Sequence, residues 1–336
     1  MRKLFVLTFL ACVVLSGASR PGAVFLMIWP GARSTAMAGA FSAISDDATA
    51  CYYNQGGLGF IDGMIASLQH SNWLKGLHPD MYYEYAGFTK ALKSGTLGFD
   101  VIYLTTGKTE VRDFDGKYLG EYTTFDIAIG ANYGFKINNN LGLGAGWKFI
   151  YSYLVAPWVW LRIPDLGIRS GGIGIAYAFD FGALYKPTSF LALSTTLQNL
   201  GPGISYTDSG RDDPLPITLR LGFRVQPISS RIVKINLTGE ITKVLVGMFA
   251  DPDQTFTEKL GYEFDEAWKG IGLELDYFNF IILRGGYFYD KEGARIGLTY
   301  GGGVRAGNFY LDVGVDQAIY EFPTSNVKFS LSYYFK

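Results

Sequence analysis

Along most of the chain, apolar and polar side chains alternate one by one. In residues 141–153 the odd positions are apolar or aromatic, whereas the even positions are mostly glycine or polar. The same period of two recurs in residues 125–136, 217–226 and 233–242. This period places successive side chains on opposite faces of a β-strand. Each segment is therefore predicted to be a strand with one apolar face and one polar face.

The alternation predicts fourteen strands. They span residues 63–71, 81–91, 96–105, 122–136, 141–154, 172–186, 190–199, 216–226, 232–242, 270–277, 280–289, 294–304, 309–318 and 327–336. In the last twelve, charged residues such as Asp180 and Arg220 occupy the register opposite the apolar one. A Lys or Arg that faces lipid at the bilayer midplane costs about 2–4 kcal/mol. Charges confined to one register therefore indicate that the other register contacts lipid.

A soluble β-sandwich is the alternative, because its strands also alternate. Three features favour a membrane barrel. The polar register is rich in Gly, Ser, Thr and Asn, which suits a crowded lumen. The apolar register often ends in aromatic residues, such as Tyr103, Trp147 and Tyr277, at the height expected for aromatic girdles. The last strand carries Phe335 beside the C-terminus, which resembles the assembly signal of bacterial outer-membrane barrels. The sequence thus predicts an all-β fold, a 14-stranded antiparallel transmembrane β-barrel of the bacterial outer membrane.

The connections between strands fall into two classes. Tight turn signals occur at residues 138–140, 186–189, 226–230 and 305–308. Longer links span residues 106–121, 155–171, 200–215 and 243–269. Outer-membrane barrels place short turns in the periplasm and long loops outside the cell. Side chains alone fill a barrel of roughly eight strands, so fourteen strands predict that another element occupies the lumen.

Residues 19–62 are the candidate for that element. They precede the first strand and combine bulky side chains, such as Phe25 and Trp29, with a small, Gly- and Ala-rich stretch at residues 31–41. A flexible linker is the alternative, and the bulky residues argue against it. We expect this segment to form an N-terminal hatch inside the barrel.

The first eighteen residues predict a signal peptide. Met1, Arg2 and Lys3 provide a positive start, residues 4–15 are apolar, and small residues precede a cleavage site after Ala18. A buried helix or a membrane anchor is the alternative, but the apolar stretch is too short to span a bilayer. The predicted organisation is a signal peptide at 1–18, a hatch at 19–62 and a barrel at 63–336. Cleavage leaves Cys51 as the single cysteine, so no internal disulfide is expected.

Composition and charge exclude further classes of protein. The chain is 49% hydrophobic and 16% aromatic, which excludes a disordered protein. Its net charge is −1; removal of Arg2 and Lys3 leaves 27 basic and 30 acidic residues, a net charge of −3. Such a chain has no basic field for phosphates, so no nucleic-acid partner is expected.

Catalytic and metal-binding patterns are weak. The only histidines are His70 and His78, and neither has a convincing setting for a Ser-His-Asp unit. Two His and one mature Cys do not build a typical zinc site. The acidic pairs Asp46-Asp47 and Asp251/Asp253 lack the ligand spacing of an EF-hand loop. We therefore predict a non-enzymatic protein with no cofactor and no metal.

Several motifs resemble one family. Residues 31–58, with the pair Asp46-Asp47 and the end Asn54-Gln55-Gly56-Gly57-Leu58, look like the N-terminal hatch of FadL-like barrels and especially of the PorV/PorQ family. Residues 125–130, the Gln-Asn-Leu-Gly-Pro element at 198–202 and residues 214–222 resemble the same family, in the same order. The likeness covers nearly all of the mature chain. It departs at Gln55 and Gly56, where the family hatch usually carries Pro and Ala.

The resemblance implies a fourteen-stranded outer-membrane barrel with a hatch, whose motif here comprises Asp46, Asp47, Asn54, Gly57 and Leu58. Family members include type IX secretion components, which receive secreted proteins through a C-terminal sorting domain and deliver them to a surface attachment complex. Relatives in the wider FadL group conduct hydrophobic molecules. Two functions are thus expected as alternatives: handling of secreted cargo, and passive transport of a hydrophobic small molecule. Outer-membrane lipid is a partner in both.

A predicted outer loop offers one candidate contact surface. Residues 156–164 include Trp158, Trp160 and Leu161 close together. Large apolar side chains exposed as a group usually mark an interaction surface, here for a partner or a ligand. The alternative is that Trp158 and Trp160 fold inward over the barrel mouth or belong to the aromatic girdle, and we favour this alternative because packed loops are common on barrels.

Overall fold

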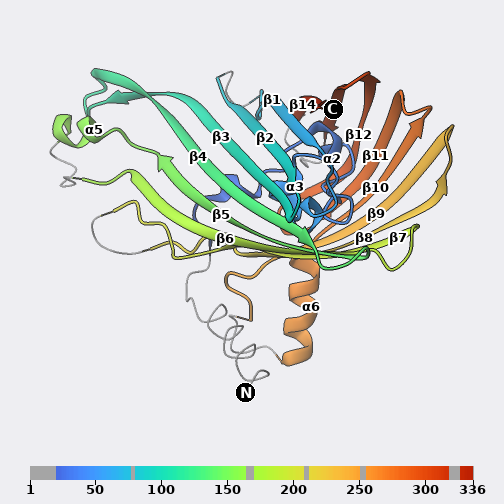
Figure 1. Cartoon of the computed structure of the whole chain (residues 1–336). Coiled ribbons are helices and arrows are strands. Elements are labelled where there is room, and N and C mark those ends of the chain that lie inside the picture. Colours follow the sequence, from blue (N-terminus) through green and yellow to red (C-terminus); the bar gives the residue numbers. More distant parts are fainter. Residues whose placement is uncertain are drawn as a thin grey trace.

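The computed structural model describes residues 20–76, 80–163, 170–207, 212–249, 255–317 and 326–335. The predicted signal peptide and His78 lie outside these ranges. Within them, fourteen antiparallel strands close into one barrel, in which each strand pairs with its neighbours in the chain and β1 pairs with β14 (Figure 1).

The strands follow one another in chain order around the barrel. Their bounds are β1 (Met64–Asn72), β2 (Tyr82–Leu92), β3 (Gly95–Arg112), β4 (Tyr118–Lys136), β5 (Leu141–Tyr153), β6 (Ile173–Tyr185), β7 (Leu191–Leu200), β8 (Thr218–Ser229), β9 (Val233–Val244), β10 (Trp268–Tyr277), β11 (Ile281–Asp290), β12 (Arg295–Ala306), β13 (Phe309–Asp316) and β14 (Asn326–Phe335). The helices are η1 (Val24–Met27), α2 (Ala32–Thr35), α3 (Ala50–Tyr53), α4 (Gln55–Leu58), α5 (Pro157–Arg162) and α6 (Phe256–Glu266). No described helix has the length and apolar character needed to cross a membrane.

The predicted barrel is confirmed, and most strand ends agree with the prediction to within two or three residues. One predicted loop is wrong. Residues 106–121 were expected to form a long link, but most of them extend β3 and β4 into a protruding hairpin. A register shift between Thr105 and Gly107 interrupts the alternation, and beyond it the apolar side chains Val111 and Leu119 pack against residues of α5 instead of continuing the outward face of the barrel. A prediction of strands from alternating apolar and polar residues therefore misses this part of the hairpin.

A second difference concerns the turn expected at residues 226–230. Strand β8 continues through Pro227 to Ser229, with a register shift between Val225 and Ile228. Proline cannot donate a hydrogen bond to a strand ladder and is therefore tolerated at such irregularities. The turn itself occupies residues 230–232.

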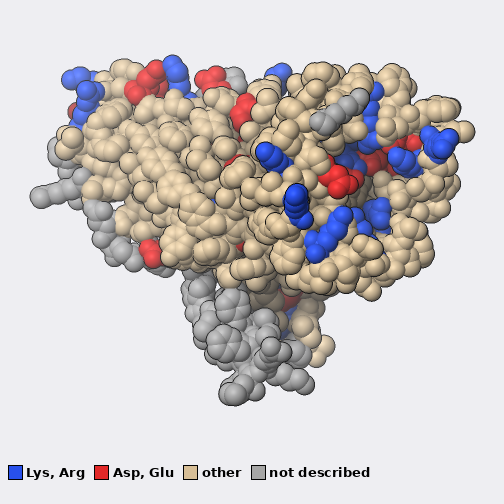
Figure 2. Space-filling model, in the orientation of Figure 1, with Lys and Arg blue, Asp and Glu red and all other residues tan. Residues whose placement is uncertain are grey.

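The two registers face as the alternation predicts. Trp147 and Ile129 point outward, with exposed fractions of 44% and 45%, whereas Asp180 and Arg220 point into the barrel, with 2% each. In Figure 2 the flank of the barrel forms a broad belt with few charged atoms. Strands β1 and β2 carry an exception on their outward faces. His70 and Glu84 occupy facing outward positions, with Nδ1 and Oε1 2.6 Å apart.

The barrel has two different ends. The connections at residues 93–94, 137–140, 186–190, 230–232, 278–280 and 307–308 are short and lie together at what we call the short-turn end. The opposite, long-loop end carries the β3–β4 hairpin together with α5 and α6 (Figure 1). Helix α6 begins with a capping box, in which Thr255 and Glu258 bond each other's backbone N–H groups.

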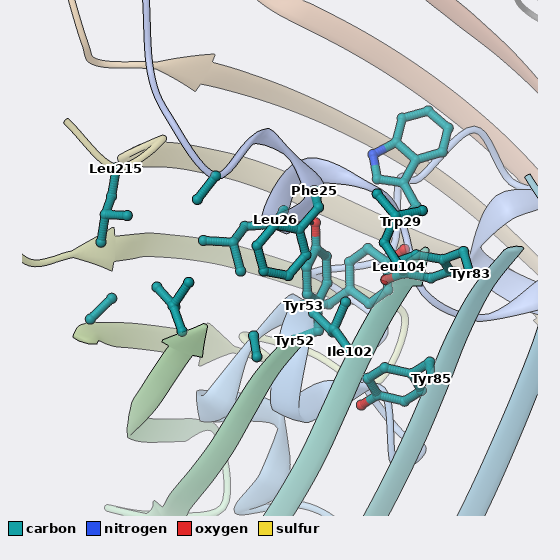
Figure 3. Packing of buried hydrophobic residues seen from close by; sticks show 14 of the residues in the cluster. Phe25, Leu26, Trp29, Tyr52, Tyr53, Tyr83, Tyr85, Ile102, Leu104 and Leu215 are labelled. Atoms are coloured by element: carbon teal, nitrogen blue, oxygen red, sulfur yellow. Dashed lines mark hydrogen bonds between the residues drawn. The ribbon is translucent and has the colours of Figure 1, made fainter. Parts of the chain in front are cut away.

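Residues 20–62, called the N-terminal segment below, lie inside the barrel (Figure 1). Phe25 and Leu26 are each 2% exposed. Figure 3 shows the main buried cluster, in which these side chains and Trp29 pack with Tyr52 and Tyr53 of the same segment and with inward-facing strand residues. The barrel therefore encloses its hydrophobic core around this segment.

Candidate functional site

Helix α4 is seated on a glycine-lined part of the wall. A Cβ added to Gly144 would lie 2.3 Å from the backbone oxygen of Gln55, and one added to Gly182 would lie 2.3 Å from Oδ1 of Asn54. The fit is mutual, since a Cβ on Gly56 would meet wall backbone atoms at 2.9 Å. Glycine at 56, where the family hatch carries a larger residue, thus allows direct backbone contact between α4 and the wall.

Hydrogen bonds of the Asn54 side chain stabilise the contact between α4 and the wall. Its side-chain oxygen accepts a hydrogen bond from the Gly56 N–H at 2.9 Å, which caps α4. Its Nδ2 donates to the carbonyl of Ser42 at 2.9 Å and to that of Ala183 at 3.1 Å. Leu58 is fully buried at the other end of the helix. One side chain therefore joins two parts of the N-terminal segment to strand β6.

On the opposite wall, Arg33 forms the main charged contact. Its Nε and Nη2 donate to both carboxylate oxygens of Glu274 in β10, at 2.7 and 2.9 Å. Its Nη1 lies 2.6 Å from Asp46 and 3.4 Å from Asp47. Glu274 also accepts from Arg284 at 2.8 Å. A buried charge costs several kcal/mol unless paired, so this network ties the segment to the barrel.

The acidic pair of the predicted hatch motif divides between two environments. The Asp46 side chain is 55% exposed, whereas that of Asp47 is 12% exposed. Burial raises the pKa of the Asp47 carboxyl, while Arg33 and two hydrogen bonds from Thr49 act in the opposite direction. Burial also raises the pKa of the Cys51 thiol well above its usual value, which keeps it protonated and unreactive.

A second buried charge network joins the segment to β7, β8 and β9. Arg220, which is 2% exposed, donates to Gln198 at 2.8 Å, to Glu240 at 2.9 Å and to the Tyr52 hydroxyl at 3.1 Å. Glu240 in turn accepts from the Ser42 N–H at 2.9 Å. The family-like element at 198–202 thus supplies a residue that positions Arg220, a role that its sequence does not reveal.

An aromatic pocket lies between the start of the N-terminal segment and the wall. It has a volume of about 210 Å³ and is lined by Val24, Met27, Ile28, Trp29, Trp73, Trp268, Arg295, Asp316 and Lys328. Trp29 contacts Phe288 edge to face at 4.6 Å between ring centroids. Arg295 pairs with Asp316 at 2.9 Å and lies over the Trp29 ring at 5.2 Å.

Lys328 provides a second cation at this pocket. It is buried and its Nζ donates to the backbone carbonyl of Trp29. The same Nζ lies 5.7 Å from the Trp73 ring centroid and 5.5 Å from that of Tyr83. Apolar walls with a few placed polar groups are typical of small-molecule pockets. The sequence pattern identifies Phe25 to Trp29 but not these partners, because they come from distant strands.

The loop residues Trp158, Trp160 and Leu161 lie together in α5, at the long-loop end. Trp158 packs edge to face on Tyr122 at 6.1 Å, and Trp160 donates its indole N–H to the Gly171 carbonyl at 2.9 Å. Both are half-buried against a small cluster around Val111, Ala156, Val159 and Ile163. Leu161 is 80% exposed. The cluster braces α5 against the protruding hairpin.

The predicted site residues therefore form two separate groups. Asp46, Asp47, Asn54, Gly57 and Leu58 lie inside the barrel, and Gly57 packs so closely that an added Cβ would lie 2.4 Å from the Ser45 carbonyl oxygen. Trp158, Trp160 and Leu161 lie outside it. Across the described ranges, no group of three or more His, Cys, Asp or Glu residues is arranged to hold a metal ion.

Several solved structures share this fold. The toluene transporter TodX of P. putida matches with a TM-score of 0.59 and 14% identity, over 91% of this chain and 98% of that chain. The toluene transporter TbuX of Ralstonia pickettii gives 0.55 and 14%, over 91% and 98%. A Pseudomonas aeruginosa FadL homologue gives 0.50 and 15%, over 90% and 98%. These likenesses establish a FadL-like barrel.

Sequence comparison narrows the assignment further. No curated protein matches the chain significantly. The family model described as type IX secretion system protein PorV matches residues 19–251, which is 233 of the 336 residues. The match includes the N-terminal segment, the glycine-lined seat of α4 and both aromatic loop residues of α5. With the FadL-like barrel around them, these residues place the chain in the PorV family of type IX secretion system proteins.

Proposed function

We propose that this protein is a non-enzymatic outer-membrane component that handles secreted proteins, or their attachment to the cell surface, in type IX secretion. The match to the PorV family over residues 19–251 carries this proposal. In this proposal the N-terminal segment is a hatch, and its buried bonds to both walls support a lumen kept closed. Cargo would then be bound at the surface rather than conducted through the barrel.

The long-loop end is the proposed contact surface. Leu161 is 80% exposed on α5, and the half-buried Trp158 and Trp160 hold that helix on the β3–β4 hairpin. Exposed apolar side chains on a rigid support favour binding, since little conformational entropy is lost on association. We therefore assign Leu161 the direct contact and the two tryptophans a supporting role.

Affinity purification from native membranes tests this function. We expect the tagged protein to recover proteins with C-terminal sorting domains, and Leu161→Asp to reduce that recovery several-fold. Leu260→Asp is the matched control, because Leu260 is also exposed, at 46%, but on α6. Recovery of no such cargo by the native protein would exclude the proposed function. Equal loss in both variants would exclude α5 as the contact.

The aromatic pocket favours a second candidate function, passage or binding of a hydrophobic small molecule. Its three tryptophans suit an apolar body, and Lys328 with Arg295 suits an anionic end group. A fluorescent dansyl fatty acid is a suitable probe. We expect it to bind the native protein saturably and Trp268→Ala at least tenfold more weakly. Trp147→Ala, on the outer face, should bind normally. Equal binding by both variants would exclude the pocket.

A further inference from the structure

Three basic side chains converge at the mouth of the barrel on the short-turn end, where Lys136 is exposed and Lys186 and Arg224 are half-buried. Arg224 of β8 pairs in register with Ala192 of β7. Lys186 lies one step beyond the paired residues Tyr185 and Leu193, which places it across from the same alanine. Adjacent strands are about 4.8 Å apart, so Lys186 and Arg224 flank a small residue at a Cα separation of about 10 Å.

Lys136 joins this pair from β4, and an aromatic ring lies between the two lysines. Lys136 pairs in register with Gly142, and the ring of Phe60 packs on that glycine. The Nζ of Lys186 lies 3.9 Å from the Phe60 ring centroid and that of Lys136 lies 5.2 Å away. Both ammonium groups therefore gather around the last part of the N-terminal segment.

The cluster formed by Lys136, Lys186 and Arg224 has too few acidic side chains nearby to neutralise its three positive charges. None of the three makes an ion pair within the described ranges. Arg224 donates to Gln226 at 3.3 Å, and its buried Nε has no hydrogen-bond partner in the described structure. Asp46 is the nearby carboxylate, but it is bonded to Arg33 at 2.6 Å. Lys186 and Arg224 thus share one nearby carboxylate that already has a partner.

Burial and like-charge repulsion disfavour the charged form of Lys186. Burial lowers the pKa of its ammonium group, and the neighbouring Arg224 and Lys136 lower it further, while Asp46 opposes them. A bound anion would relieve this repulsion and replace the water that these groups lose. The cluster is therefore built as an acceptor for negative charge.

The surrounding rim has the same sign. The six connections at the short-turn end contain Lys93, Lys186 and Arg231 and no acidic residue. The long-loop end, in contrast, carries charges of both signs, among them Lys108, Arg112, Asp113 and Glu258. In Figure 2, blue side chains gather toward the right of the molecule, with red side chains among them. The basic connections of the short-turn end would attract an anion to that mouth of the barrel.

We propose that Lys136, Lys186 and Arg224 form an oxyanion site at the short-turn mouth, which binds a carboxylate or phosphate group beside Phe60. Cationic side chains at this spacing bind such groups through charge-assisted hydrogen bonds. The oxyanion comes either from a free small anion or from an acidic side chain of a protein that docks at this mouth. The site is independent of cargo binding at the long-loop end.

Titration calorimetry on the full mature protein in non-ionic detergent tests the site. Inorganic phosphate and a tetraglutamate peptide are the two probes, at low ionic strength. We expect saturable binding of at least one probe, and at least tenfold weaker binding by the double variant Lys186→Gln/Arg224→Gln. Lys259→Gln, which removes a positive charge from α6 at the long-loop end, is the control and should retain normal affinity.

The two probes distinguish between a free small anion and an acidic side chain of a docking protein. Binding of phosphate and peptide alike points to a small-anion site, whereas binding of the peptide alone points to a docking protein. Binding of neither probe, or equal binding by the double variant and the native protein, would overturn the proposal. A second variant, Lys136→Gln/Lys186→Gln, leaves Arg224 in place and should also bind weakly. Heat-modifiability on gels confirms that each variant forms a barrel.

Discussion

A single added methyl group on the wall should displace α4. In Gly144→Ala the new Cβ would lie 2.3 Å from the backbone oxygen of Gln55 and 2.4 Å from its carbonyl carbon. Ordinary contact begins at 3.4 Å, so the two backbones must separate by about 1 Å. Strand β5 is hydrogen-bonded on both sides. We therefore expect the helix, rather than the wall, to move.

The cost of this displacement follows from the contacts that α4 loses. Overpacking of this kind costs about 1–3 kcal/mol. Loss of the hydrogen bond from Asn54 to the Ala183 carbonyl accounts for about 1 kcal/mol of this cost. Because 1.4 kcal/mol is a factor of ten, the population with a displaced segment should rise about 5-fold to 150-fold.

Cys51 reports this population directly. It is the only cysteine in the described residues and is 2% exposed, so a maleimide should modify it only when the segment opens. We expect its labelling rate to rise by the same factor in Gly144→Ala. Gly285→Ala is the matched control, since its nearest atom would be 4.0 Å from the added Cβ. Equal labelling rates in the two variants would refute the reasoning.

Three further predictions concern other contacts. Arg33→Gln removes two charge-assisted hydrogen bonds from Glu274, which keeps Arg284 as a partner, and should destabilise the packed segment by about 1.5–3 kcal/mol; Cys51 labelling in urea measures this, and an unchanged midpoint would contradict it. Hydrogen bonds with Thr255 hold the pKa of Glu258 below its usual value, so their stabilising effect is present above the ordinary Glu pKa and is lost as pH falls through the lowered one. Hydrogen-exchange protection factors of α6 should fall over that window, and in Thr255→Ala, which keeps only the backbone hydrogen bond to Glu258, this pH dependence should be weaker. Trp158→Ala removes the packing of α5 on the β3–β4 hairpin and should speed proteolysis of that loop, whereas equal cleavage rates would show that α5 is held by other contacts.

The strands are the part of this fold that sequence reasoning predicts well. Each carries its own period of two, and the charges of Asp180 and Arg220 must avoid lipid, so local information is sufficient. The β3–β4 hairpin escapes prediction because, beyond Thr105, a register shift breaks the period of two, and the few apolar side chains there pack on α5 rather than facing lipid. Its length depends on cross-strand partners and on α5, which a local pattern does not contain.

The candidate sites depend on contacts between distant residues. Asn54 is recognisable in a motif, but its partner is the backbone of Ala183, which has no sequence signature. Likewise, Lys186 and Arg224 are far apart in the chain, and only the pairing of β6, β7 and β8 brings them to the same alanine. Motifs thus indicate which residues matter, whereas the register of the barrel determines what they do.

The contacts of the N-terminal segment also constrain the order of assembly. Ala32 donates to Ser330 of β14 at 2.9 Å, Arg33 bonds β10, and Asn54 bonds β6. Strands β6, β10 and β14 lie on different sides of the closed barrel, and β14 is the C-terminal strand. The contact of Ala32 with β14 therefore depends on a residue 298 positions away in the chain, and the N-terminal segment can make all three contacts at once only in a cylinder whose β1–β14 seam is closed.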